Sequence, residues 1–471
     1  MPRGDSGRAM KILSLAVRNL LRNRRRSLTT LLAMIVGLVA ILLFGGYRSN
    51  IMYGLQTSFV QNSGHLQVQH KDYFLDGSDN PTAYGIPDYQ RIIAAIKRDP
   101  VLAPMLTVVT PTLQLGGIAG NFSAGISRSV LAVGLVAEER NRLLQWNDYE
   151  VFSYSKPPPL VGTGEDAVVV GTGVARKLNL CNALKVPNCT QAPIAAVAEG
   201  ERAPDDIAAL SALEKNNIPQ QDETRIELLA ATAHGAPNVA SLNVVKAENK
   251  GIKALDDVYL AMHLARAQKL IYGSTPPQVT AIMVQLQHTH QIAEAKARLE
   301  KLLATEFKTA PLEVLDFGVL NPMYGQTLQF MDSMFGFIAV LIGVIVLFTI
   351  GNTMSTAVVE RTVEIGTLRA MGLRRSGIRR LFMCEGIVLG VIGSAIGVLC
   401  ALSIAYLINH SGWSWIPPGY SYAYLILVRV WQDPFLMIGS VIGLIAVTVV
   451  SAWWPANRAA KLMIVDALRH V

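Results

Sequence analysis

Residues 334–352 read MFGFIAVLIGVIVLFTIGN, a stretch without one charged side chain. The uncharged run around it extends from Ser333 to Val359, which at about 1.5 Å per residue covers the roughly 30 Å hydrocarbon core of a bilayer. Comparable runs begin at Ser27, after Glu385 and after Asp433. We therefore predict four transmembrane helices rather than buried helices of a soluble protein, at residues 27–48, 333–359, 386–408 and 434–457.

The charges of the chain favour the same interpretation and orient the helices. Only 16% of the residues are charged, against roughly 25% in ordinary soluble domains. The net charge of +8 comes from basic residues beside the hydrophobic runs, which indicates membrane topology rather than nucleic-acid binding. These basic residues are concentrated in segments 1–26, 360–385 and 458–471. The positive-inside rule predicts that both termini and the 360–385 loop are cytoplasmic, with residues 49–332 and the short loop 409–433 outside.

Two alternatives concern the N-terminal region. The first apolar run exceeds the roughly 7–15 residues of a cleaved signal peptide, and no small-residue cleavage site follows it, so an uncleaved anchor is expected. The stretch KILSLAVRNLLRNRRR (residues 11–26) places Ile12, Leu13 and Leu20 on one stripe, with basic residues opposite. This pattern predicts an amphipathic helix on the membrane surface or, equally, a basic anchor that only sets the orientation.

The external segment 49–332 is large enough for a folded domain with two lobes. Strand-like runs alternate with helical patterns, which predicts an α+β domain. The stretch 181–224, rich in Ala, Pro, Asn and Asp, is interpreted as an insertion or flexible connection with a short helix at Asp205–Lys215. Strands are expected at 65–69, 106–115, 130–136, 167–170, 226–229 and 279–286, and helices at 89–98, 254–270 and 289–307.

The chain has four cysteines. Cys181 and Cys189 lie in the external segment, where disulfides persist if the compartment is oxidising. A bond between them is expected, with two free thiols as the alternative. Cys384 and Cys400 fall at or inside the third predicted span, where a thiol packs as a small apolar side chain.

Motifs for catalysis are missing from the sequence. It contains no G-x-x-x-x-G-K-[ST] loop for nucleotide phosphates and no G-x-S-x-G or H-E-x-x-H motif. We therefore expect that the chain is not itself an enzyme and holds no cofactor. His288 and His290 are spaced for one face of a strand, but no Cys or carboxylate pattern accompanies them, so metal binding is not expected. The predicted spans contain no interior Asp, Glu, Lys or Arg, which disfavours ion-coupled transport.

The loop 360–385, ERTVEIGTLRAMGLRRSGIRRLFMCE, is too patterned for a simple connection. Its first half predicts a helix with Ile365, Leu368 and Met371 on one side and charged neighbours beside them. Gly372 ends this helix, and a second helix leads into the third span. A short projecting helix with apolar anchors fits a groove on a cytoplasmic partner. The alternative is an interfacial loop whose Arg side chains bind lipid phosphates.

Small residues recur with a spacing of four in the later spans. Such pairs let helices approach closely in lipid, either within one chain or between two copies. The sequence leaves both uses open for the pairs Gly386/Gly390, Gly393/Gly397 and Gly439/Gly443.

Taken together, several stretches resemble the FtsX-like, MacB-like ABC transporter permease family. Residues 18–37 resemble the N-terminal start of that family. Residues 360–397 resemble its loop and third span, and residues 454–469 resemble its C-terminal end. The MacB-type periplasmic core resembles DAVVVGTGVARKLNL (166–180), TRIELLAAT (224–232) and LDDVYLAMHLARAQKLI (255–271). The insertion at 181–224 departs from that compact pattern.

This resemblance implies a function and its partners. Members of the family form dimers of identical or homologous permeases, joined to a separate cytoplasmic ATPase that binds ATP and Mg²⁺. ATP hydrolysis moves the external domains, a mode called mechanotransmission, so a substrate need not cross the bilayer. Residue by residue, the resemblance assigns to the ATPase-coupling helix the positions Glu360, Glu364, Ile365, Gly366, Leu368, Arg369 and Gly372.

The layout is most similar to that of the LolC/LolE-type lipoprotein-releasing permeases. It implies a multi-pass protein of a bacterial inner membrane, with its large domain in the periplasm, that acts on lipoproteins, lipids or other envelope substrates. Two other functions stay open. One is a non-transporting regulator of a periplasmic partner, as in FtsX. The other is efflux of small molecules or peptides with an adaptor, as in MacB, which the missing fused ATPase disfavours.

Overall fold

The computed structural model describes residues 18, 22, 24–77, 80–151, 156–186, 189, 223–416 and 423–462. Most of the chain divides into two compact units, with the divisions between Tyr53 and Gly54 and between Tyr324 and Gly325. We call residues 54–324 the α/β unit and the long helices on either side of it the helical unit. The helix predicted at Asp205–Lys215 lies outside the described residues, as does most of the N-terminal stretch 11–26.

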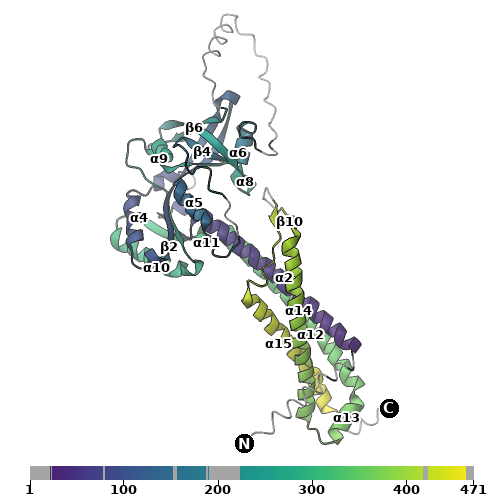
Figure 1. The fold of residues 1–471 in the computed structure, drawn as a ribbon. Coiled ribbons are helices and arrows are strands. Elements are labelled where there is room, and N and C mark those ends of the chain that lie inside the picture. The colour runs from purple at the N-terminus through teal and green to yellow at the C-terminus, as the bar shows by residue number, and fades with distance from the viewer. Residues whose placement is uncertain are drawn as a thin grey trace, which may run out of the picture. The chain divides into compact units, whose positions relative to one another are not determined.

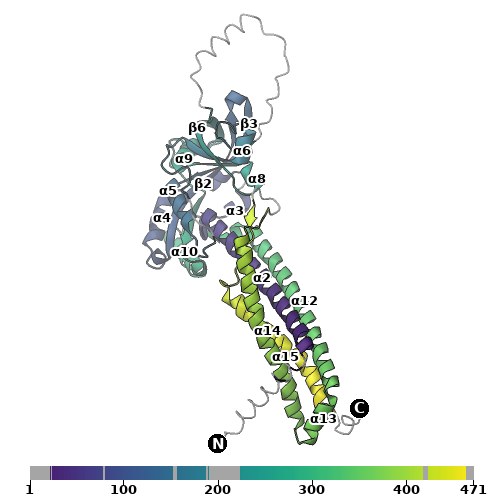
Figure 2. The same cartoon turned by 45° about the vertical axis from the view of Figure 1, so that its right-hand side comes forward.

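The helical unit is drawn as long coiled ribbons in Figures 1 and 2. Its described helices are α2 (Arg24–Ser63), α12 (Pro322–Glu360), α13 (Thr362–Ala370), α14 (Arg375–Ser411) and α15 (Pro434–Lys461). Two short strands, β10 (Ser414–Trp415) and β11 (Tyr424–Leu425), lie between α14 and α15 in the sequence. Four of the helices, α2, α12, α14 and α15, are long and apolar enough to cross a membrane. The predicted class, four membrane helices and a large α+β domain, is confirmed.

The helices extend beyond the spans predicted from hydropathy. Helix α2 continues to Ser63 instead of ending at residue 48, and α12 begins at Pro322 instead of residue 333. Hydropathy marks only the apolar part, whereas a helix continues until its backbone bonding is interrupted, as at Gly64, whose φ is +75°. Arg48 and Asp332 therefore lie in helices, where they form an ion pair. The α/β unit begins at Gly54 and ends at Tyr324, which lies within the predicted bounds 49 and 332.

Glycines on α14 let two other helices approach it closely. A Cβ added at Gly386 would lie 2.9 Å from the Cβ of Ala452 on α15. One added at Gly397 would lie 2.9 Å from a methyl carbon of Leu38 on α2. The first two predicted glycine pairs thus pack helices within one chain. The third pair, Gly439/Gly443, instead lines an apolar cavity of about 400 Å³ between α2, α12 and α15.

The α/β unit is organised around one mixed sheet whose described strands have the order β3-β7-β4-β6-β5-β2-β8-β1-β9. An additional β2–β3 pairing closes the first six of these strands into a ring. The bounds are β1 (Leu66–His70), β2 (Leu106–Asn121), β3 (Ile126–Leu135), β4 (Ala167–Gly171), β5 (Arg225–Ala231), β6 (Pro237–Glu248), β7 (Tyr259–His263), β8 (Ala281–Leu286) and β9 (Leu312–Asp316).

Strand β2 belongs to both parts of this sheet. Its first half pairs with β8, from Leu106 to Thr112, and its second half pairs with β3, from Thr112 to Asn121. Helix α9 (Leu264–Tyr272) packs against five strands of the ring, β2, β3, β5, β6 and β7. The remaining described helices are α3 (Tyr73–Asp76), α4 (Tyr89–Arg98), α5 (Ala137–Gln145), α6 (Thr172–Lys177), α8 (Lys253–Asp256), α10 (Ile292–Glu306) and α11 (Phe317–Leu320), with short 3₁₀ turns at Pro81–Tyr84, Ala103–Met105, Phe122–Ala124 and Thr289–Gln291.

The predicted helix at 254–270 is wrong in its middle. Residues Tyr259–His263 form strand β7, which lies parallel to β3 and antiparallel to β4. Their side chains Leu260 and Met262 are fully buried in the core. Ala, Leu and Met favour a helix in isolation, but pairing on both edges and burial outweigh that small local preference.

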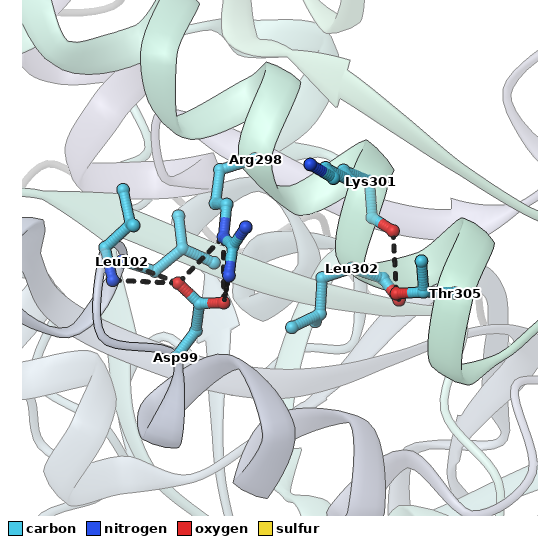
Figure 3. Close-up of polar contacts among 7 residues, drawn as sticks. Asp99, Leu102, Arg298, Lys301, Leu302 and Thr305 are labelled. Carbon is cyan, nitrogen blue, oxygen red and sulfur yellow. Dashed lines mark hydrogen bonds and ion pairs between the residues drawn. The ribbon is translucent and has the colours of Figure 1, made fainter.

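Helices α4 and α10 are joined by a charged pair shown in Figure 3. Asp99, directly after α4, accepts from Arg298 of α10 through Nε at 2.9 Å and Nη2 at 2.6 Å. Its Oδ1 also accepts from the backbone N–H groups of Val101 and Leu102 at 2.9 and 3.0 Å. The hydrogen bonds from Arg298 lower the pKa of Asp99, so the carboxylate stays ionised although its side chain is only 2% exposed.

Candidate functional site: the loop around α13

The loop between α12 and α14 contains one short helix with defined ends. Helix α13 starts after Arg361, and its last turn closes with N–H donation from Met371 to Thr367 at 2.9 Å and from Leu373 to Leu368 at 3.0 Å. Gly372 has φ +94°, a value that side chains rarely adopt. The structure places the predicted helix end at this glycine.

The apolar side chains of α13 divide between two faces. Ile365 is 3% exposed and Gly366 is buried, while Leu368 is half-buried. Ile365 belongs to the same cluster as Phe382 of α14 and Ala456 of α15. The prediction that Ile365 is offered to a partner is therefore not supported by the geometry, because this side chain packs inside the chain. The outward apolar side chains of the loop are Val363 (45% exposed), Met371 (74%) and Leu373 (40%).

The charged residues assigned to α13 lie at its edges. Glu364 is exposed and forms an ion pair with Arg22. Arg369 is half-buried and donates from Nη1 to the backbone carbonyl of Leu462, just after α15. Glu360 is exposed at the last residue of α12. Glu364 and Arg369 thus contact Arg22, which precedes α2, and Leu462, which follows α15.

Two residues that the sequence analysis did not single out form the most buried polar contact of this loop. Arg361 donates from Nη1 to Oε1 of Glu385 on α14 at 3.0 Å. The two residues are 7% and 2% exposed. They are the second and the last residue of the loop 360–385. The sequence does contain a signal for this pair, because Arg361 and Glu385 have opposite charges and lie near the ends of two uncharged runs.

The α/β unit shows no metal-binding arrangement among its described residues. His288 and His290 stack with their ring centres 5.4 Å apart, and His288 Nδ1 lies 2.7 Å from Oδ1 of Asp148. The contact between His288 and Asp148 is thus a hydrogen bond, with the ring of His290 stacked on that of His288. Cys181 and Cys189 are joined by a disulfide, with their Cα atoms 5.7 Å apart. Cys384 and Cys400 are free and half-buried.

His65 is a buried histidine that takes part in the packing of the α/β unit. Its Nδ1 accepts from the backbone N–H of Leu286 at 3.0 Å, and its ring meets the edge of Trp146 at 4.8 Å. Burial lowers the pKa of His65 to about 3, with a smaller opposing effect from Asp148. A neutral imidazole, with its proton on Nε2, is therefore built into the fold.

Acidification should destabilise the α/β unit through His65. The pKa of His65 is about 3 in the folded chain and about 6.5 in the unfolded chain. Between these two pH values, the unfolded chain binds a proton at His65 and the folded chain does not. The contribution of the neutral His65 to the free energy of unfolding is therefore complete above pH 6.5 and decreases as the pH falls. At pH 4.5 the free energy of unfolding is lower by about 3 kcal/mol. Denaturation midpoints measured from pH 8 to 4.5 should fall less in His65→Asn, whose side-chain oxygen can accept from Leu286 without titrating. Identical pH profiles would refute this role.

Comparison with known proteins places this loop in a family. The family profile described as FtsX-like permease C-terminal matches residues 336–464, which include α13, Arg361 and Glu385. Residues 336–464 are therefore similar to the C-terminal part of FtsX-like permeases. The chain is 35% identical over 144 residues to the ABC transporter permease YtrF of Bacillus subtilis, a match that covers 29% of this chain and 31% of that protein.

Two further proteins are similar to this chain. It is 27% identical over 215 residues to the macrolide export ATP-binding/permease protein MacB of Bordetella avium, covering 46% of this chain and 29% of that protein. The solved extracellular domain of the noncanonic ABC-type transporter YknZ matches with a TM-score of 0.28 and 11% identity, covering 53% of this chain and 99% of that one. The chain thus spans under a third of the two curated relatives named here.

Proposed function

We propose that this chain is the membrane subunit of an ABC complex in which a separate cytoplasmic ATPase docks on the outward face of α13. ATP and Mg²⁺ would bind to that ATPase, and a second permease, identical or homologous, would complete the complex. Hydrolysis would move the α/β unit on the far side of a bacterial inner membrane by mechanotransmission. Lipoproteins, lipids or other envelope components are the proposed substrates.

The exposed apolar face of the loop carries this proposal. Val363, Met371 and Leu373 are exposed, although the neighbouring Ile365 shows that the same short helix can bury a side chain completely. Exposed apolar side chains on a helix with fixed ends are what a partner's groove recognises. The charged residues around them, Glu364 and Arg369, are already bonded within the chain, so the apolar residues are the ones free to make the contact.

A charge placed on this face should remove the ATPase. In Met371→Asp, the co-purification of a nucleotide-hydrolysing protein from native membranes in mild detergent should fall by roughly tenfold or more, because burying an unpaired carboxylate in an interface opposes binding. Quantitative mass spectrometry of the purified protein measures this loss. Leu75→Asp is the matched control, since Leu75 in α3 is 75% exposed against 74% for Met371. An ATPase that stays bound equally to both variants would contradict the docking surface.

The same experiment separates the proposal from its main alternative. If the loop were held only by Arg side chains on lipid phosphates, Met371→Asp would leave the set of co-purified proteins unchanged. Replacement of the exposed Arg379 and Arg380 by Gln would then weaken membrane attachment instead. Mass spectrometry of the lipids retained with the protein distinguishes the two results.

A further inference from the structure

Arg361 is bonded to three helices at once. Its backbone N–H donates to Ala357 of α12 at 3.2 Å, and its carbonyl accepts from Ile365 of α13 at 2.9 Å. Its side chain donates to Glu385 of α14 at 3.0 Å. The residue is the one position between the end of α12 and the start of α13. It therefore links the docking helix to both neighbouring spans.

The partner of Arg361 occupies an equally constrained position. Glu385 is 2% exposed and precedes Gly386, where α14 makes its close approach to Ala452 of α15. A carboxylate at this point cannot shift along α14 without disturbing that helix contact. The geometry of the ion pair is thus set on one side by the α12–α13 junction and on the other by the α14–α15 contact.

Stability alone does not account for such a pair. Two charges lose their hydration on burial, and apolar side chains of similar size often stabilise a protein as well or better. A hydrogen-bonded ion pair differs from an apolar contact in having a direction, because Nη1 and Oε1 must be aligned. The apolar contacts of this nine-residue helix, through Ile365 and Leu368, have no such directional requirement. The pair therefore sets a direction at the start of α13, as the hydrogen bond from Arg369 to the Leu462 carbonyl does near its end.

We propose that Arg361 and Glu385 are a positioning pair, which holds α13 at one angle on α14 so that a displacement of the docked helix moves both spans together. This inference rests on the proposed function, since it assigns a role to the support of the docking helix. Neither residue touches the ATPase in this arrangement. Their effect is exerted through the orientation of the outward face with Val363 and Met371.

The test compares a double apolar variant with its controls in the full-length protein. In R361M/E385M, both charges are replaced by unbranched apolar side chains of similar length, so no charge remains buried alone. The reversed pair R361E/E385R restores a pair of opposite charges. R22A removes the exposed Arg22–Glu364 ion pair, which is 58% and 48% exposed and should matter little. R361E alone gives the effect of an unmatched charge.

One readout needs no ATPase. Spin labels on cysteines introduced at the exposed positions Thr367 on α13 and Val391 on α14, with Cys384 and Cys400 replaced by serine, report the distance between the two helices. The distance distribution should broaden about twofold or more in R361M/E385M, return toward the original width in the reversed pair, and stay unchanged in R22A. The thermal midpoint of R361M/E385M should stay close to that of the original protein, which a purely stabilising role would not predict.

The second readout is ATP hydrolysis by the complex isolated with its own ATPase. In R361M/E385M the kcat should fall about tenfold while KM for ATP is unchanged, because the nucleotide site lies on the other subunit. A narrow distance distribution together with an unchanged kcat in R361M/E385M would overturn the positioning role. If the original protein brings down no ATPase, the proposed function fails, whereas the spin-label distances still decide whether the pair orients α13.

Discussion

Replacing Gly386 with leucine is expected to lower the thermal midpoint of the full-length protein by about 10 °C, equivalent to roughly 3 kcal/mol. A Cβ at this position would lie 2.9 Å from the Cβ of Ala452 and 3.5 Å from the carbonyl oxygen of Thr448. Neither atom can rotate away, because one is fixed to the backbone and the other belongs to it. Helices α14 and α15 must therefore separate, and lipid provides no hydrophobic force to hold them together.

The control for this substitution has the same small-residue spacing in another place. At Gly439 and Gly443 of α15, an added Cβ meets no atom of the described chain within 4 Å, since both glycines line the cavity between α2, α12 and α15. Gly439→Leu should leave the midpoint within about 2 °C of the original, or raise it, because leucine also favours a helix over glycine. Fluorescence-detected size exclusion after heating measures both variants in one detergent. Equal losses in the two would show that Gly386 has no special packing role.

The membrane helices were predictable because lipid imposes a strong and simple requirement. A soluble domain rarely contains an uncharged run as long as 334–352, whereas a helix that crosses a bilayer needs one, and the position of this run in α12 follows directly. The use of the glycine pairs was not predictable, because the same spacing appears at Gly386/Gly390 and at Gly439/Gly443. Which of them meets another helix depends on the rotation of each helix in the bundle, and local sequence does not specify that rotation.

The candidate site was located from the sequence, but the buried and exposed faces of α13 were not. The pattern in the loop predicted α13 and its end at Gly372, both of which depend on local backbone preferences. It grouped Ile365 with Met371, whereas Ile365 is buried and Met371 is exposed. A helix of nine residues is too short for periodicity to separate the packed face from the free one. The Arg361–Glu385 contact joins residues 24 positions apart, which only the tertiary arrangement brings together.

In the α/β unit, some strands were found near their observed positions, among them β1, whose sequence alternates, and β8, which is a short apolar run. Strand β7 was missed because it is followed directly by α9, so that residues 254–270 had the composition of one continuous helix. The six-strand ring could not be inferred at all, since β3 and β7 pair across more than a hundred residues. The motif DAVVVGTGVARKLNL (166–180) contains a glycine-threonine-glycine sequence whose role follows from the contacts of Asp256.

Asp256 is a buried residue, 5% exposed, whose carboxylate accepts hydrogen bonds from the first N–H groups of α6. It accepts from the backbone N–H groups of Thr172 and Gly173 at 3.0 Å each, and from that of Lys250 at 3.1 Å. The Thr172 hydroxyl donates to it as well. Gly171 is required beside it, because a Cβ there would lie 2.1 Å from the Asp256 carbonyl oxygen. The glycine-threonine-glycine sequence therefore serves to let this carboxylate approach the backbone.

Asp256→Ala should destabilise this part of the sheet by about 4 kcal/mol, because one buried N–H group, that of Gly173, and two partly buried ones, those of Thr172 and Lys250, lose their acceptor at roughly 1–3 kcal/mol each. Hydrogen exchange of the full-length protein, followed by mass spectrometry of peptides from residues 166–180, should show protection reduced by about a thousandfold. Asp257→Ala is the control, since Asp257 only pairs with Lys177 at 3.2 Å on the surface and should change protection less than about fivefold. Similar exchange in both variants would show that these N–H groups find other acceptors, and that Asp256 does not hold α6 against β4.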